Sequence, residues 1–175
     1  MTAVRDRVAA ADTLARQQAR VDRLVARAVA GGGWSARLSA GERARLVALG
    51  HFPAYASELA WTPCEVAGHL RDSALVFTER IYRLRTEPQP LLADFVPDEP
   101  ARVAGYRAVP PVQLAEQLRA AQAALYDSVA GLDPADLSRA GVHEIDGPLT
   151  LADLLDFLPA HQRDHADQLA ALLDR

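Results

Sequence analysis

Residues 150–173 read TLADLLDFLPAHQRDHADQLAALL, and the spacing of the apolar and histidine side chains in this stretch indicates the fold. Positions separated alternately by three and four residues form one face of a helix, and an apolar face of this kind packs inside a helical bundle. The residues on this face are Leu151, Leu154, Leu158, His161, His165, Gln168 and Leu172. The stretch therefore predicts one long helix, which begins after a Thr150/Asp153 cap and runs nearly to Arg175.

His161 and His165 lie one helical turn apart on this buried face. Two imidazoles at that spacing point the same way, as a shared metal ion requires. Buried imidazoles need polar partners, so a hydrogen-bonded pair in the core is the alternative to a metal site. The histidine pair alone leaves both interpretations open.

Three more long helices are predicted by the same kind of pattern, and a short amphipathic piece is expected at about 40–49. The second long helix has a strong start signal, because Thr62, Pro63 and Glu65 supply a capping box with proline at the first helical position. The expected long helices cover about 4–30, 63–87, 112–130 and 151–175. The fold class is therefore all-α. A proline-rich connection at about 87–111 shows no periodicity and is long enough for the second and third helices to run parallel.

Length and composition narrow the function classes. The 175 residues suit one domain, and the net charge of −4 with no basic stripe argues against nucleic acid as a partner. All basic residues are Arg, and the only cysteine, Cys64, rules out an internal disulfide. We see no signal peptide at the start and no stretch of about 20 apolar residues, so we expect a cytoplasmic protein without a membrane partner.

His69 is the third histidine expected on an inward helix face. It lies seven residues after the Thr62 cap, beside Val66, Leu70 and Ser73. If the second and fourth helices pack together, His69 faces the His161/His165 pair, and three neutral imidazoles can hold a divalent cation with a position left for water or substrate. The two other histidines, His51 and His143, fall in predicted loops and are expected to be solvated or capping.

The segments WTPCEVAGHL at 61–70 and HQRDHADQL at 161–169 resemble the DinB/YfiT-like superfamily of candidate metalloenzymes. The resemblance covers about 59–173 of a single domain, 1–175. It implies a four-helix bundle of up-down-down-up topology with a long crossover between helices 2 and 3. It also implies that His69, His161 and His165 hold Zn, Ni or a similar divalent metal. The connection at 31–60 is longer than the resemblance leads us to expect, so the site entrance should differ.

We expect a divalent-metal-dependent enzyme acting on a small-molecule substrate, as a thiol-dependent S-transferase or a hydrolase. By the resemblance, a low-molecular-weight thiol is the cosubstrate and a homodimer is the favoured assembly. The alternatives are a non-catalytic metal- or ligand-binding protein active in stress, and a bundle whose histidines are structural. No general base is evident, and Asp72, Asp164 and Gln168 are the candidates for orienting the histidines.

Overall fold

The computed structural model describes residues 7–50 and 56–174, so His51 lies outside the described residues. The described chain is mostly helical, which confirms the all-α prediction. Four long helices form the body of the molecule: α1 (Arg7–Gly31), α3 (Pro63–Thr86), α5 (Pro111–Ala130) and α6 (Leu151–Leu173). The predicted short piece is α2 (Ala40–Ala48). The observed ends lie close to the predicted ones wherever the chain is described.

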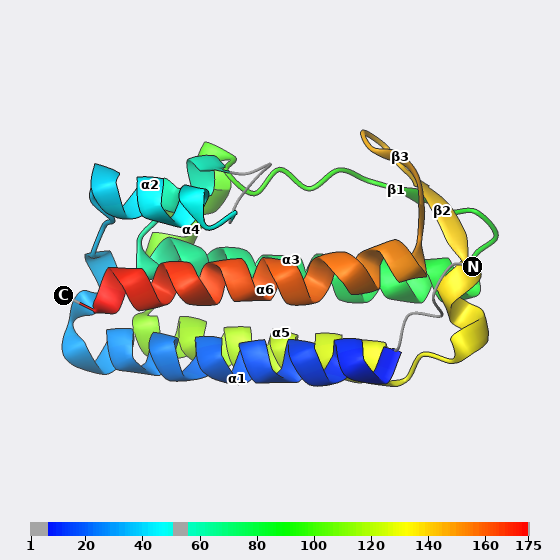
Figure 1. The fold of residues 1–175 in the computed structure, drawn as a ribbon, viewed down its shortest axis with the longest axis horizontal. Helices are drawn as coiled ribbons and strands as arrows, with labels where there is room; N and C mark the ends of the chain where they lie inside the picture. Colours follow the sequence, from blue (N-terminus) through cyan, green and yellow to red (C-terminus); the bar gives the residue numbers. More distant parts are fainter. Residues whose placement is uncertain (1–6, 51–55, 175) are drawn as a thin grey trace.

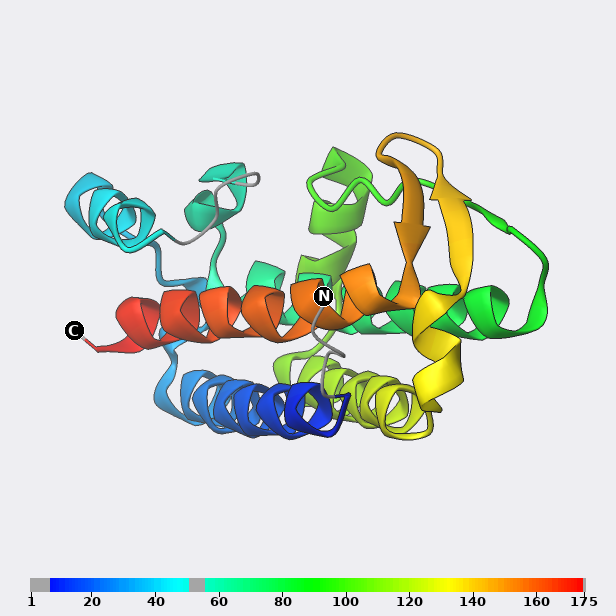
Figure 2. The same ribbon diagram turned by 45° about the vertical axis from the view of Figure 1, so that its right-hand side comes forward.

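The long helices lie along the long axis of the molecule in two layers (Figure 1). Helices α3 and α5 run in one direction, and α1 and α6 run in the other. Helix α2, the small sheet and the crossover from α3 to α5 lie on one side of the α3/α6 layer, opposite α1 and α5 (Figures 1 and 2). The face of α3 and α6 that α1 and α5 leave free is therefore covered by connecting segments.

The start of α3 is fixed by the capping box that the sequence predicts. The Thr62 side chain accepts from the Glu65 amide at 3.4 Å, and the Thr62 amide donates to Glu65 Oε2 at 2.7 Å. The Thr150/Asp153 pair does the same for α6. Because both helices begin at a defined residue, the rotation of their histidine faces about the helix axis is also defined.

Apolar side chains fill the bundle along its whole length. One buried cluster joins α1, α3, α5 and α6 at the end that carries the sheet, and it includes Phe77, Leu125 and Leu155. A second cluster lies toward the other end and includes Trp61 and Leu169. In the described residues, no helix is both long enough and apolar enough to span a membrane.

Two connections contain structure that the sequence analysis did not predict. The crossover carries strand β1 (Leu91–Leu92) and helix α4 (Pro100–Ala108), where no periodic element was expected. The connection before α6 forms strands β2 (Ala140–His143) and β3 (Gly147–Thr150). The sheet has the order β1-β2-β3, parallel in the first pair and antiparallel in the second.

His143 is a capping residue, which is one of the two roles that we expected, but it is buried on a strand rather than solvated in a loop. It lies on β2 with 5 % of its surface exposed, because the sheet and α3 cover it. Its Nε2 is 2.9 Å from Arg80 Nη2, and its Nδ1 accepts from the amides of Ile145 and Asp146. The imidazole therefore caps the turn of the β2–β3 hairpin from a buried position.

Candidate metal centre

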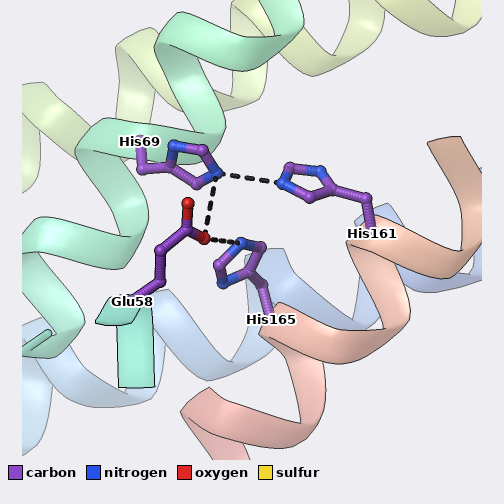
Figure 3. A group of neighbouring side chains, drawn as sticks. All are labelled: Glu58, His69, His161 and His165. Atoms are coloured by element: carbon purple, nitrogen blue, oxygen red, sulfur yellow. Dashed lines mark hydrogen bonds and ion pairs between the residues drawn. The ribbon is translucent and has the colours of Figure 1, made fainter. Parts of the chain in front are cut away.

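Three elements bring four polar side chains together in the interior (Figure 3). His69 comes from α3, and His161 and His165 come from successive turns of α6. Glu58 comes from a one-turn 3₁₀ helix, η2 (Ala56–Ala60), just before α3. All four are at most 4 % exposed. The structure thus brings together the three histidines that the sequence analysis singled out.

The distances between these side chains suit a shared cation. His69 Nε2 lies 2.9 Å from His161 Nε2, and Glu58 Oε2 lies 3.2 Å from His165 Nε2. All four ligand atoms lie within 4.8 Å of one another. In a tetrahedral zinc site with bonds of about 2.0–2.1 Å, neighbouring ligand atoms are about 3.3 Å apart. The buried Glu/His₃ group could therefore hold a metal ion.

Gln168 determines which nitrogen of His165 faces the group. Its Nε2 donates to the backbone carbonyl of Glu58 at 2.7 Å, and a carbonyl can only accept, so the amide orientation is fixed. Gln168 Oε1 then lies 2.9 Å from His165 Nδ1, which must carry the proton. His165 Nε2 is then the nitrogen that faces Glu58 and the other imidazoles, and in a neutral ring it carries the lone pair. This confirms the contact expected of Gln168.

The environment keeps two of the imidazoles neutral. Burial, followed by the proximity of His165 and His161, lowers the pKa of His69 well below its ordinary value of 6.5. Burial, followed by the proximity of His165, likewise lowers the pKa of His161. A neutral imidazole offers the lone pair that a metal ion needs, whereas an imidazolium does not.

Aromatic rings line the group on several sides. The Trp61 ring centroid is 4.9 Å from that of His69, and Phe157 stacks on His161 at 5.1 Å. Phe95, from the crossover, stacks on His69 at 6.2 Å. These walls are apolar and keep bulk water from the polar group, which strengthens electrostatic interactions inside it.

The other two candidates for orienting the histidines bind arginine side chains. Asp72 binds the guanidinium groups of Arg71 and Arg102 and accepts from the Tyr106 hydroxyl. Asp164 pairs with the neighbouring Arg163 at 2.7 Å. The Ser73 hydroxyl lies 3.4 Å from His69 Nδ1 and 3.3 Å from His69 Nε2, so it contacts the ring without selecting one nitrogen.

Glu58 is the residue of the group that the sequence analysis missed. It belongs to the last part of the long 31–60 connection, after the amphipathic piece at 40–49, where no helical periodicity marks an inward face. One signal was available, because an acidic residue followed by Leu59, Ala60 and Trp61 is flanked by side chains that tend to be buried.

The sequence of the chain matches a known protein family. The family model described as the DinB superfamily matches residues 12–169, which include all of α3 and α5, most of α1 and α6, and the four residues of the Glu/His₃ group. No curated protein and no solved structure matches the chain. The match covers most of the chain, and so the protein belongs to the DinB superfamily.

Proposed function

We propose that the protein is a divalent-metal-dependent enzyme acting on a small molecule, with His69, His161 and His165 as metal ligands. The single observation that carries this proposal is the convergence of three buried imidazoles from two helices, with His69 and His161 separated by 92 residues in sequence. Rigid helices hold ligands more firmly than loops do, which favours a preformed site.

A divalent ion bound there would lower the pKa of a bound thiol or water, so that either could act as a nucleophile near neutral pH. We favour a low-molecular-weight thiol by analogy with the superfamily. In that reaction the sulfur forms a bond to an electrophilic carbon, the leaving group departs with the bonding electron pair, and the thiol proton passes to solvent. Water in place of the thiol would give hydrolysis.

The chain's own residues support a small substrate. The group is buried behind Trp61, Phe95 and Phe157, which favours a small substrate whose apolar or aromatic part could lie against these rings. Three imidazoles suit zinc or nickel, and we propose one of these two as the resident ion. The reaction belongs in the cytoplasm, where low-molecular-weight thiols are kept reduced.

Metal content measured by elemental mass spectrometry on untagged protein tests the proposal. Wild-type protein should carry one equivalent of zinc or nickel, and both His69→Ala and His161→Ala should lose it while circular dichroism remains helical. His143→Ala is the matched control, since His143 is also buried but belongs to the hairpin. It should retain the metal.

Activity is then measured with the metal-loaded protein. Electrophilic small molecules are offered with a thiol and without one, and S-conjugates and hydrolysis products are separated by chromatography. A product that requires both the metal and His161 supports the enzyme. Wild-type protein that binds neither zinc nor nickel on reconstitution would overturn the proposal. Stoichiometric metal without turnover across the screen would instead favour the non-catalytic binding protein.

A further inference from the structure

Glu58 is a buried carboxylate with an unmet electrostatic requirement. It is 3 % exposed, and its Oε2 atom accepts no hydrogen bond from any residue that the structure describes. An ionised carboxylate is strongly disfavoured in the interior unless a cation or several donors compensate it. The side chain is nevertheless aimed into the group of imidazoles (Figure 3).

The distances place this oxygen among the ligand atoms. Glu58 Oε2 is 3.2 Å from His165 Nε2 and 3.8 Å from His69 Nε2. These separations are close to the edges of about 3.3 Å in a tetrahedral site with typical zinc bond lengths. A carboxylate that acted through an intervening water would lie farther from the nitrogens than a ligand does.

The backbone that carries Glu58 is held to one of the histidines. Gln168 bridges the Glu58 carbonyl and His165 Nδ1, with contacts of 2.7 Å and 2.9 Å. The neighbouring Leu59 is 1 % exposed, which anchors η2 in the interior. The position of the carboxylate relative to His165 is therefore built into the fold, as a ligand position requires.

We propose that Glu58 is a fourth protein ligand of the metal ion, beside His69, His161 and His165. This assignment rests on the proposed metal-dependent function and adds to it. A site with four protein ligands is closed, whereas one with three keeps a position open. Because Glu58 stands on a one-turn segment outside the bundle helices, it would be the ligand to give way when a thiol or water binds.

Cobalt(II) titration of the metal-free protein tests the assignment. Two quantities are measured: the dissociation constant, by competition with a chelator, and the visible d–d spectrum, which reports the ligand set. We expect Glu58→Gln to weaken Co²⁺ binding by at least about tenfold, the lower end of the loss seen on removing even an orienting residue. The intensity and position of the d–d bands should change as well. Glu79→Gln, an exposed glutamate on α3, is the matched control and should leave both quantities unchanged.

Glu58→Asp separates ligation from charge. This variant keeps the negative charge but withdraws the oxygen by one methylene, so a ligand should be lost and the spectrum should change as in Glu58→Gln. If Glu58→Gln fails to fold, as judged by circular dichroism, the aspartate variant decides by the same two readouts. An aspartate variant with wild-type affinity and spectrum would show that Glu58 acts only through its charge and would overturn the assignment.

The remaining outcomes distinguish the two proposals. Wild-type affinity and spectrum in Glu58→Gln, with Co²⁺ binding abolished in His161→Ala, would overturn the role of Glu58 and leave the three-histidine site standing. A wild-type protein that binds no Co²⁺, Zn²⁺ or Ni²⁺ would overturn both.

Discussion

At the scale of single residues, Gln168 has the most informative contacts in the candidate centre. Its one amide group satisfies the Glu58 carbonyl and fixes the tautomer of His165. We expect Gln168→Leu to weaken metal binding by about 10- to 100-fold, as is typical when a residue that orients a ligand is removed. Chelator competition on the folded variant measures this loss.

Gln162→Leu is the matched control for this experiment. Gln162 is also buried on α6, but it accepts a hydrogen bond from Gln122 rather than contacting a histidine. Its replacement should lower the unfolding temperature and leave the metal dissociation constant unchanged. Equal affinity losses in the two variants would mean that Gln168→Leu weakens metal binding by destabilising the fold, and not by releasing His165.

The residues of the site differed in how far they could be predicted. His69, His161 and His165 lie on long helices, where a period of 3.6 residues in the sequence is enough to identify the buried face. Glu58 lies on a single 3₁₀ turn, which is too short to show a period. Its place beside His165 depends on a contact with Gln168, 110 residues away, and local pattern carries no information about such a contact.

At the scale of elements, α4 lies against α3 at a point where only glycine fits. A Cβ atom on Gly68 would come within 2.2 Å of the Tyr106 ring, which is 1 % exposed. We expect Gly68→Ala to push α4 away and to destabilise the protein by about 1–3 kcal/mol, as overpacking usually does. The gain of about 1 kcal/mol from better helix propensity offsets only part of this loss. Thermal unfolding followed by circular dichroism measures the net change.

Gly105→Ala tests the same exchange on α4, where an added Cβ meets no atom within 4 Å. Only the helix-propensity gain should remain there, so this variant should unfold at a higher temperature than the wild type. A Gly68→Ala protein as stable as Gly105→Ala would contradict the close packing of Tyr106 on α3.

The capping glutamate of α3 predicts a dependence of stability on pH. Burial alone would raise the pKa of Glu65, but hydrogen bonds from the Thr62 amide, Arg107 and the Thr62 hydroxyl together outweigh it and lower the pKa below 4.5. The stabilisation is therefore fully present above pH 4.5 and is lost as the pH falls through the lower folded-state value. Glu65→Gln retains the capping box, so its urea midpoint should lie below that of the wild type at pH 7 and approach it in acid.

Arg107→Gln removes the same ion pair from the other side, because the Arg107 guanidinium binds Glu65 Oε1. It should show the same approach to wild-type stability in acid. A gap between wild type and Glu65→Gln that stays constant from pH 7 to pH 3 would contradict the lowered pKa.

The elements themselves were predictable where they are long and local. The capping boxes at Thr62 and Thr150 marked the starts of α3 and α6 correctly. The sheet was missed because β1 has two residues, too few to show alternation, and pairs with β2 about fifty positions later. The Asp146–Gly147 pair, a common hairpin-turn sequence, was the one local signal for β2 and β3.

At the scale of the whole molecule, the two layers of helices have different roles: the α1/α5 layer contributes packing, and the α3/α6 layer with its covering segments carries the candidate centre. Helices α1 and α5 pack against α3 and α6 and contribute none of the four polar side chains of the candidate centre. The centre lies between α3 and α6, and the covering segments supply Glu58 from η2 and Phe95 from the crossover. Access to the centre therefore depends on the connections, while the geometry of the three histidines depends on the bundle.

Phe95 is the position at which this division can be tested. Its ring stacks on His69, and the guanidinium of Arg102, which lies on α4 of the same crossover, is 4.7 Å from the ring centroid. Arg102 also donates to Asp72 of α3, so the crossover is held against the bundle beside the centre. We expect Phe95→Ala to speed the transfer of bound metal to a chelator, because solvent then reaches His69, while the far-ultraviolet circular dichroism stays unchanged. Stopped-flow measurement with a coloured chelator gives the rate.

Val96→Ala is the control, since Val96 is the next residue along the crossover and its side chain is 49 % exposed. It should release metal at the wild-type rate. If Phe95→Ala and Val96→Ala release metal equally fast, the crossover does not limit access. The route to the centre should then pass beside Phe157, which stacks on His161 and is 38 % exposed, whereas Trp61, which stacks on His165, is only 6 % exposed. Phe157→Ala would then be the variant that speeds release, because its ring is the remaining partly exposed wall of the site.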